Sequence, residues 1–450
     1  MKKHFLVLTA CFVMFGMLLS SCSSDALIRP VDSLLSPPLY YEEYEDLVDT
    51  FYKSVGEEVT LTHPGKGEHR SAIIVNDVDS DGESEALVFY RNSNDGTSAR
   101  MHFLDFVDGR WISDGDFNGY GNFVESIKIT DMDNDGSFEF VVMWAAPGVS
   151  TGSIMSIYRS QKNVREYKEI SNEACSISEI VDIDSDGKKE IFFVALSNAA
   201  GVIHRTAKAM KLSGDSVKLI GETRVDPNIS SYTSIKTEKS SDEEPMKIYI
   251  DALKGESQMI TEIIYWDKEE SLLCAPLFDT ATMSTTATLR YEPVGCADIN
   301  NDGIIDIPVQ SRIFGKGDSL LTTDTEDIYL TEWKNFSSGA FKPVADTLIN
   351  YSDGYMIYLD ESEMNSTGIR NYRSQNCWVV YRTDAAGEST GEIYSVLKIF
   401  ADRWNPEKFS AYIPIVEKDD GVVCVYVTQT GKDMGIDEEF VKSKITKVPS

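Results

Sequence analysis

Four nine-residue stretches decide the fold: DVDSDGESE at 77–85, DMDNDGSFE at 131–139, DIDSDGKKE at 182–190 and DINNDGIID at 298–306. Each has an acid or an amide at positions 1, 3 and 5, a glycine at position 6 and an acid at position 9. Their first residues are 54, 51 and 116 residues apart, so the last interval is about twice the others. A motif that returns at such a period is typical of a repeat protein.

The chemistry of these loops predicts a bound cation. Three or four carboxylates within nine residues repel one another, and only a cation offsets that repulsion in every copy. Ligands that are all oxygen indicate a hard ion, and a flexible shell suits Ca²⁺ better than Mg²⁺, which needs stricter geometry. We therefore expect about four structural Ca²⁺ sites. The predicted ligands are Asp77, Asp79, Asp81, Glu85, Asp131, Asp133, Asp135, Glu139, Asp182, Asp184, Asp186, Glu190, Asp298, Asn300, Asp302 and Asp306.

A fifth copy is expected in the middle of the long interval. Residues 239–247 take the place of an acidic loop there, and Ser234-Ile235-Lys236 matches Ser126-Ile127-Lys128 at the same offset. This copy opens with Lys239 and has lost the acids of positions 1, 3 and 9, so it should hold no metal.

The segments between the loops are predicted to be strands. Apolar runs enter and leave each loop, such as 71–75 before and 86–90 after the first. A second hairpin follows, with turn signals at Asp108-Gly109, Ser213-Gly214-Asp215 and Ser337-Ser338-Gly339. Four strands per period form one blade of a β-propeller. The sequence thus predicts a mainly β fold, a β-propeller with five recognisable blades, or with seven if the C-terminal residues add two more.

The loop differs from helical calcium-binding modules in where its last acid stands. An EF-hand needs an acid at position 12, whereas position 12 here is Val88, Val142, Phe193 or Val309. The pattern instead resembles the calcium loops of FG-GAP/VCBS repeats in integrin α-subunit-like β-propellers. The resemblance covers roughly residues 55–345 and rests on the loop and the blade period, because the Phe-Gly and Gly-Ala-Pro signatures are mostly lacking. It implies that each ion pins a hairpin, and we place the propeller at 56–348.

The pattern changes after residue 348. Apolar runs at 355–359, 377–381, 392–400 and 422–427 predict strands, and 436–444 predicts a closing helix. We favour a separate C-terminal α+β domain over 349–450. The alternative is that these residues form two degenerate blades, because Asp353-Gly354 and Asp420-Gly421 fall close to the repeat spacing.

The N-terminus has the layout of an export signal. Lys2 and Lys3 precede an apolar run over 5–19, and Leu19-Ser20-Ser21-Cys22 follows. This resembles the signal of bacterial lipoproteins, which implies that 1–21 is a signal peptide and that Cys22 is lipidated. A flexible tether (22–39) and an amphipathic helix (40–55) should follow. The expected location is the extracytoplasmic face of a bacterial membrane.

Composition argues against nucleic acid as a partner, and the cysteines and histidines do not indicate a disulfide framework or a zinc site. The chain of 450 residues has 73 acidic and 42 basic residues and a formal charge of −31, which would repel nucleic acid. The five cysteines that follow Cys22 are widely spaced and mostly in apolar runs, which is typical of buried thiols. Histidines lack metal spacing, and the GVSTG string at 148–152 lies in no strand–turn–helix context, so it does not indicate a hydrolase nucleophile.

These observations favour a binding module over an enzyme. The sequence indicates a lipid anchor, a repeated blade and metal-binding loops, but it shows no group of catalytic residues. We therefore expect a cell-surface protein that binds an extracellular glycan or protein. The alternative is a carbohydrate-active enzyme, a polysaccharide lyase or glycosidase, with an acidic cleft on the propeller face.

Overall fold

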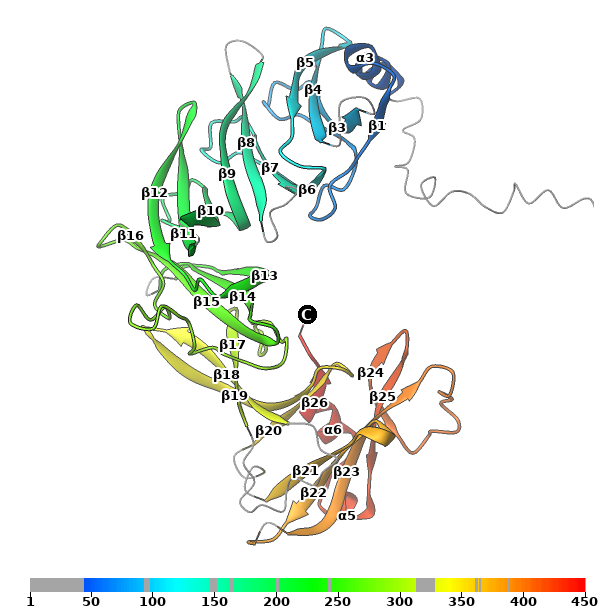
Figure 1. Cartoon of the computed structure of the whole chain (residues 1–450). Helices are drawn as coiled ribbons and strands as arrows, with labels where there is room; N and C mark the ends of the chain where they lie inside the picture. Colours follow the sequence, from blue (N-terminus) through cyan, green and yellow to red (C-terminus); the bar gives the residue numbers. More distant parts are fainter. Residues whose placement is uncertain are drawn as a thin grey trace, which may run out of the picture. The chain divides into compact units, whose positions relative to one another are not determined.

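The computed structural model describes residues 44–449 except 93–97, 146–151, 162–165, 200–201, 242–243, 313–327, 361–362, 364–365 and 387. The signal peptide, Cys22, the tether and the GVSTG string, apart from Gly152, lie outside the described residues. The fold is mainly β, as expected (Figure 1). In the part of the chain that the structure describes, no helix has the length and apolarity needed to cross a bilayer. The chain forms two compact units.

Unit 1 holds the described residues up to 131 together with 136–147 and 156–169. Its elements are α3 (Glu45–Val55), β1 (Val59–Leu61), β2 (Ile73–Asn76), β3 (Glu85–Asn92), β4 (Ala99–Val107), β5 (Arg110–Asn118), β6 (Phe123–Thr130) and β7 (Glu139–Ala145), with parts of β8 (Ser153–Gln161) and β9 (Glu166–Val181). The first sheet has the order β2-β3-β4-β5, all antiparallel, and β1 pairs with the far end of β3.

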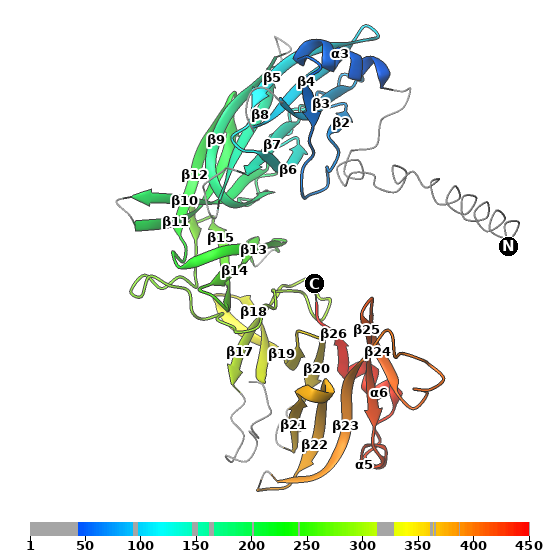
Figure 2. The same cartoon turned by 45° about the vertical axis from the view of Figure 1, so that its right-hand side comes forward.

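The expected helix is present as α3, and its apolar face packs on the first sheet. Leu47 and Phe51 are 0 % and 1 % exposed and lie in one cluster with Val88, Tyr90 and Leu104. Both views place α3 beside β4 and β5 (Figures 1 and 2). The spacing of four residues puts Leu47 and Phe51 on one side of the helix, which is why the segment forms a helix here.

Unit 2 holds the described residues of 132–135, 148–155 and 170–450, so that β9 is divided between the two units. The chain over 166–181 contains no glycine or proline, so β9 runs without a break and is an inner strand of one seven-stranded sheet, β6 to β12. The following strands are β10 (Glu190–Ala199), β11 (Val202–Ser213), β12 (Ser216–Arg224), β13 (Ile229–Glu238), β14 (Lys247–Lys254), β15 (Gln258–Asp267) and β16 (Leu272–Cys274). β9 to β12 are antiparallel neighbours, and β13 to β16 form a separate four-stranded sheet.

The next sheet consists of β17 (Asp306–Arg312), β18 (Tyr329–Ser337), β19 (Ala340–Asn350) and β20 (Tyr355–Leu359), and β26 (Ile445–Lys447) is added at its edge. The last sheet has the order β21 (Thr367–Tyr372), β22 (Cys377–Thr383), β23 (Ser389–Phe400), β25 (Gly421–Val427), β24 (Ile413–Lys418). The short helices are α5 (Gln429–Asp433), α6 (Glu438–Lys444) and the 3₁₀ turn η2 (Arg373–Gln375).

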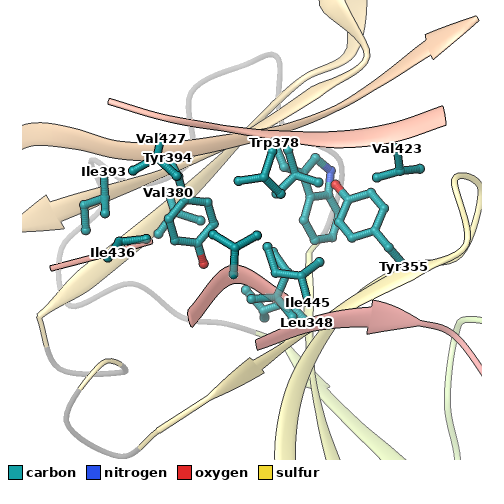
Figure 3. Close-up of a cluster of buried hydrophobic side chains, with 14 of the residues drawn as sticks. Leu348, Tyr355, Trp378, Val380, Ile393, Tyr394, Val423, Val427, Ile436 and Ile445 are labelled. Carbon is teal, nitrogen blue, oxygen red and sulfur yellow. The ribbon is translucent and has the colours of Figure 1, made fainter. Parts of the chain in front are cut away.

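The C-terminal residues share a core with the sheet before them. Leu348 and Tyr355 of β19 and β20 pack with Trp378 of β22, and the Tyr355 and Trp378 ring centroids are 5.6 Å apart (Figure 3). Ile445 returns to this cluster and pairs with Ile357. The predicted closing helix is present as α6, and Asp437 caps it by accepting a hydrogen bond of 2.9 Å from the Phe440 N–H.

Candidate metal centres

The four acidic loops have one backbone conformation. Each connects an incoming strand or extended segment to β3, β7, β10 or β17. Position 4 has a left-handed φ of 61° at Ser80, 59° at Asn134, 58° at Ser185 and 60° at Asn301. The glycine at position 6 has a φ of 87° to 91° in all four, a conformation that a side chain would strain. Sequence repetition therefore reflects a repeated structure.

Hydrogen bonds inside each loop turn its acids inward. The N–H at position 6 donates to the Asp at position 1, over 3.2 Å in the first loop and 2.8 Å in the fourth. The N–H at position 2 donates to the acid at position 9, over 2.7 Å from Val78 to Glu85 and 3.0 Å from Ile183 to Glu190. These bonds fix the side chains from both ends of the loop.

Three of the loops bring carboxylates together. One oxygen from each of positions 1, 3 and 9 lies within 4.8 Å of the other two in Asp77–Asp79–Glu85, in Asp131–Asp133–Glu139 and in Asp182–Asp184–Glu190. The acids at position 5 have a different role, because Asp81, Asp186 and Asp302 accept a hydrogen bond from the N–H of position 7. In the fourth loop Asn300 replaces one carboxylate, and its amide donates to Asp302 over 2.9 Å.

The acid at position 9 is buried in every loop. Glu85 is 5 % exposed, and Glu139, Glu190 and Asp306 are 0 % exposed. One oxygen of Glu85 and one of Asp306 accept no hydrogen bond from the described chain. Burial, with repulsion from nearby acids, raises the pKa of Glu85 to about 7 and that of Asp306 to about 6. A buried carboxylate with a bare oxygen beside two other acids is a ligand set that a cation would complete.

Neighbouring loops are also tied to each other. The Ser80 hydroxyl donates to the Gly136 carbonyl over 2.8 Å, and the Phe138 N–H donates to the Val78 carbonyl over 2.7 Å. The same two bonds recur one repeat later, from the Asn134 amide to Gly187 and from Lys189 to Met132. Any ion that stiffens one loop would therefore also stiffen the next.

The second strand after each loop supplies a residue that sequence reasoning missed. In the first sheet Asp105 of β4 lies opposite Glu85, and its charge adds to the repulsion on Asp79 and Glu85. In the third repeat Ile191 pairs with Met210, so that Lys211 of β11 lies opposite Glu190. The Lys211 Nζ is 3.1 Å from Asp184 and 2.9 Å from Glu190, and it also contacts Asp186.

The other loops have their own residue near position 9. Arg159 of β8 lies 3.3 Å from Glu139 in the second loop. Asn335 of β18 is paired with Asp306 in the fourth. Pattern reading cannot find these residues, because the strand register that brings them close is not written in the loop motif.

The expected fifth copy lies between β13 and β14, as its alignment predicts. Lys247 stands at position 9 and is 3 % exposed on its side chain. Its ammonium is 2.8 Å from Glu238 and 3.3 Å from Glu244. A protein cation therefore occupies the place where the other copies have an acid.

A second polar cluster lies under α3. The His102 Nε2 is 3.1 Å from the Ser113 hydroxyl, and its Nδ1 is 3.4 Å from Asp116. This order of contacts is that of a hydrolase triad. However, His102 is 2 % exposed, its ring packs edge-on against Phe51, and Asp116 also binds Arg100 and accepts from the Tyr90 hydroxyl over 2.7 Å. We interpret the cluster as the polar support on which α3 docks.

The five cysteines from Cys175 onward are free thiols, and Cys175, Cys296 and Cys424 are buried. Burial raises the pKa of the Cys424 thiol to about 11, so this side chain stays uncharged.

Comparison with known proteins gives no family. No family model matches the chain, and no curated protein sequence matches it. Among solved structures, Sqt1 from Chaetomium thermophilum is 8 % identical over 77 % of this chain and 93 % of its own, with a TM-score of 0.30. An exo-β-1,3-galactanase from Phanerochaete chrysosporium is 12 % identical over 88 % and 93 %, with a TM-score of 0.28. A periplasmic gluconolactonase from Pseudomonas aeruginosa is 12 % identical over 67 % and 93 %, with a TM-score of 0.23. Likenesses at these scores support no statement about the chemistry of this chain.

Proposed function

We propose that this chain is a calcium-binding β-propeller lipoprotein that serves as a binding module at the outer face of a bacterial membrane. The observation that carries the calcium assignment is the buried acid at position 9. Glu85 has a bare oxygen that is grouped with Asp77 and Asp79, and nothing in the described chain neutralises the three charges. All donors are oxygens, as Ca²⁺ requires.

The ion would supply charge neutralisation and a fixed crosslink. Asp77 and Asp79 follow β2, and Glu85 begins β3, so an ion held by these residues would clamp the two strands at one end. Because the loops are also bonded to each other, the clamp would pass from one loop to the next. This is a structural role, which leaves the ligand of the protein to be recognised elsewhere on its surface.

The propeller assignment rests on the repeated sheets. Antiparallel sheets follow one another along the chain, and four of their connections share one loop conformation. Such units are blades in a propeller, and the FG-GAP/VCBS resemblance of the loops supports that arrangement. On this assignment five blades precede the C-terminal sheet, and 349–450 either forms an α+β domain or completes the ring.

The calcium assignment is tested by isothermal titration of protein that has been stripped with a chelator. We expect binding of Ca²⁺ in preference to Mg²⁺ and a higher melting temperature with Ca²⁺, because a ligand that binds only the folded state stabilises it by mass action. Equal melting temperatures with and without a chelator would contradict the assignment.

The anchor and the binding role need separate tests. Replacing Cys22 by Ser should move the protein from the membrane fraction to the soluble fraction, and persistent membrane association would exclude lipidation. An array of glycans and a pull-down from extracellular proteins would identify the ligand. Turnover of a polysaccharide by the purified chain would instead support the alternative function, a lyase or glycosidase.

A further inference from the structure

The third loop differs from the first in the charge that faces it from the neighbouring strand. Opposite the acid at position 9 stands Asp105 in the first repeat and Lys211 in the third. The side chain of Lys211 is 20 % exposed, and its ammonium contacts Asp184, Asp186 and Glu190. The same loop motif is therefore completed in one case by another anion and in the other by a cation.

We propose that Lys211 is the resident cation of the third loop, so that this loop is neutralised by the protein itself and takes no metal ion. The inference rests on the proposed calcium role of the other loops and deepens it, because it separates the number of loop motifs from the number of ions.

The geometry of the ammonium supports this assignment. Lysine offers three N–H donors, and three carboxylates of the third loop surround its Nζ. A divalent ion would need oxygens of Asp184 and Glu190 that already face the ammonium at about 3 Å. Metal and ammonium therefore compete for one place.

A second lysine shows that the fold accepts this solution. Lys247 replaces the acid at position 9 of the degenerate copy and is held by Glu238 and Glu244. The Tyr249 hydroxyl donates to the other Glu238 oxygen over 2.9 Å, so that the pair is buried with its hydrogen bonds made. An internal ammonium thus stabilises the connection between β13 and β14.

The number of bound ions tests the inference. Full-length protein lacking only its signal segment is saturated with Ca²⁺, desalted and analysed for metal by mass spectrometry. Lys211→Met should bind one equivalent more than the wild type, and Asp105→Lys, which places an ammonium opposite Glu85, should bind one fewer. The control is Lys208→Met on the same strand, where Lys208 lies 4.0 Å from Glu222 and faces no loop, and its stoichiometry should not change.

The outcomes separate this inference from the calcium assignment. Equal stoichiometry in wild type and Lys211→Met overturns the role of Lys211 and leaves the other sites standing. A wild type without metal overturns the calcium assignment, and a gain in Lys211→Met alone would still support the role of Lys211.

Hydrogen exchange of the unmodified chain provides a second test that needs no variant. Chelation should increase amide exchange several-fold in peptides that cover 73–92, around the first loop, and clearly less in 178–196, which loses no ion of its own and is affected only through its bonds to the second loop. An equal increase in both segments would mean that the third loop also loses an ion and would refute the proposal.

Discussion

Replacement of Glu85 by glutamine should change stability in opposite directions with and without calcium. Glu85 is 5 % exposed and its pKa is raised from 4.5 to about 7, by burial and by repulsion from Asp79, Asp105 and Asp81. At pH 8 the ionised side chain therefore costs the metal-free fold about 3 kcal/mol, at about 1.4 kcal/mol per pKa unit. Glutamine has the same shape, carries no charge and can still accept the hydrogen bond from Val78.

In a chelator at pH 8, Glu85→Gln should therefore raise the free energy of unfolding by about 1 to 3 kcal/mol. In Ca²⁺ at a thousand times its Kd the sign should reverse, because the variant loses an anionic ligand and with it a stabilisation of about 4 kcal/mol, which exceeds the gain from the lost charge. Urea unfolding followed by tryptophan fluorescence, in chelator and in Ca²⁺, measures both values.

The matched control is Glu83→Gln at position 7, which removes the same charge two residues away from a side chain outside the carboxylate group. It should change neither value by more than about 0.5 kcal/mol, as is usual for side chains that make no special contact. If Glu85→Gln were destabilising to the same extent in chelator and in Ca²⁺, Glu85 would be a packing residue and the reasoning would fail.

Two further predictions concern residues away from the loops. Glu262 is 2 % exposed, and burial raises its pKa to about 8, so the folded state holds a proton that the unfolded state releases above about pH 4.5. The free energy of unfolding should therefore fall by about 1.4 kcal/mol per pH unit between about pH 5 and 8. Urea unfolding of Glu262→Gln over this pH range should show that the slope is removed. A Cβ at Gly119 would lie 2.4 Å from the Trp144 ring and 2.6 Å from the Ala99 carbonyl, so Gly119→Ala should lower the free energy of unfolding by about 1 to 3 kcal/mol in thermal unfolding. At Gly109 a Cβ meets open space, so Gly109→Ala should lower it by only about 1 kcal/mol, because of the left-handed φ.

Local chemistry explains why the loops were predictable from sequence. The glycine at position 6 is required by a φ near 90°, and the acids at 1 and 9 are required by backbone N–H groups that no strand partner satisfies. Such constraints act within nine residues, so that they recur as a readable motif. The degenerate copy could be placed for the same reason, since strands end at Glu238 and begin at Lys247 where the period demands.

Residues that act across strands could not be predicted in this way. His102 and Asp116 meet because β4 pairs with β5 with a bulge between Phe103 and Leu104, and a shift of one residue would put one of them on the other face. The unbroken course of β9 was missed as well, because a motif search marks where loops recur and does not show whether a strand ends between two of them.

The number of bound metal ions depends most on the cross-strand residues, which the sequence motif does not reveal. Four loops carry the motif, and their identical backbone shows that they are one structural device. Yet the charge at the centre of each loop is a sum over the loop and the residue opposite position 9, which is Asp105, Lys211 or Asn335 in three of the repeats. A change from Asp to Lys at that one position alters the charge by two units, as much as replacing an acid within the loop by lysine would. The motif therefore predicts where a cation is needed, and the neighbouring strand determines whether it is a metal ion or an ammonium.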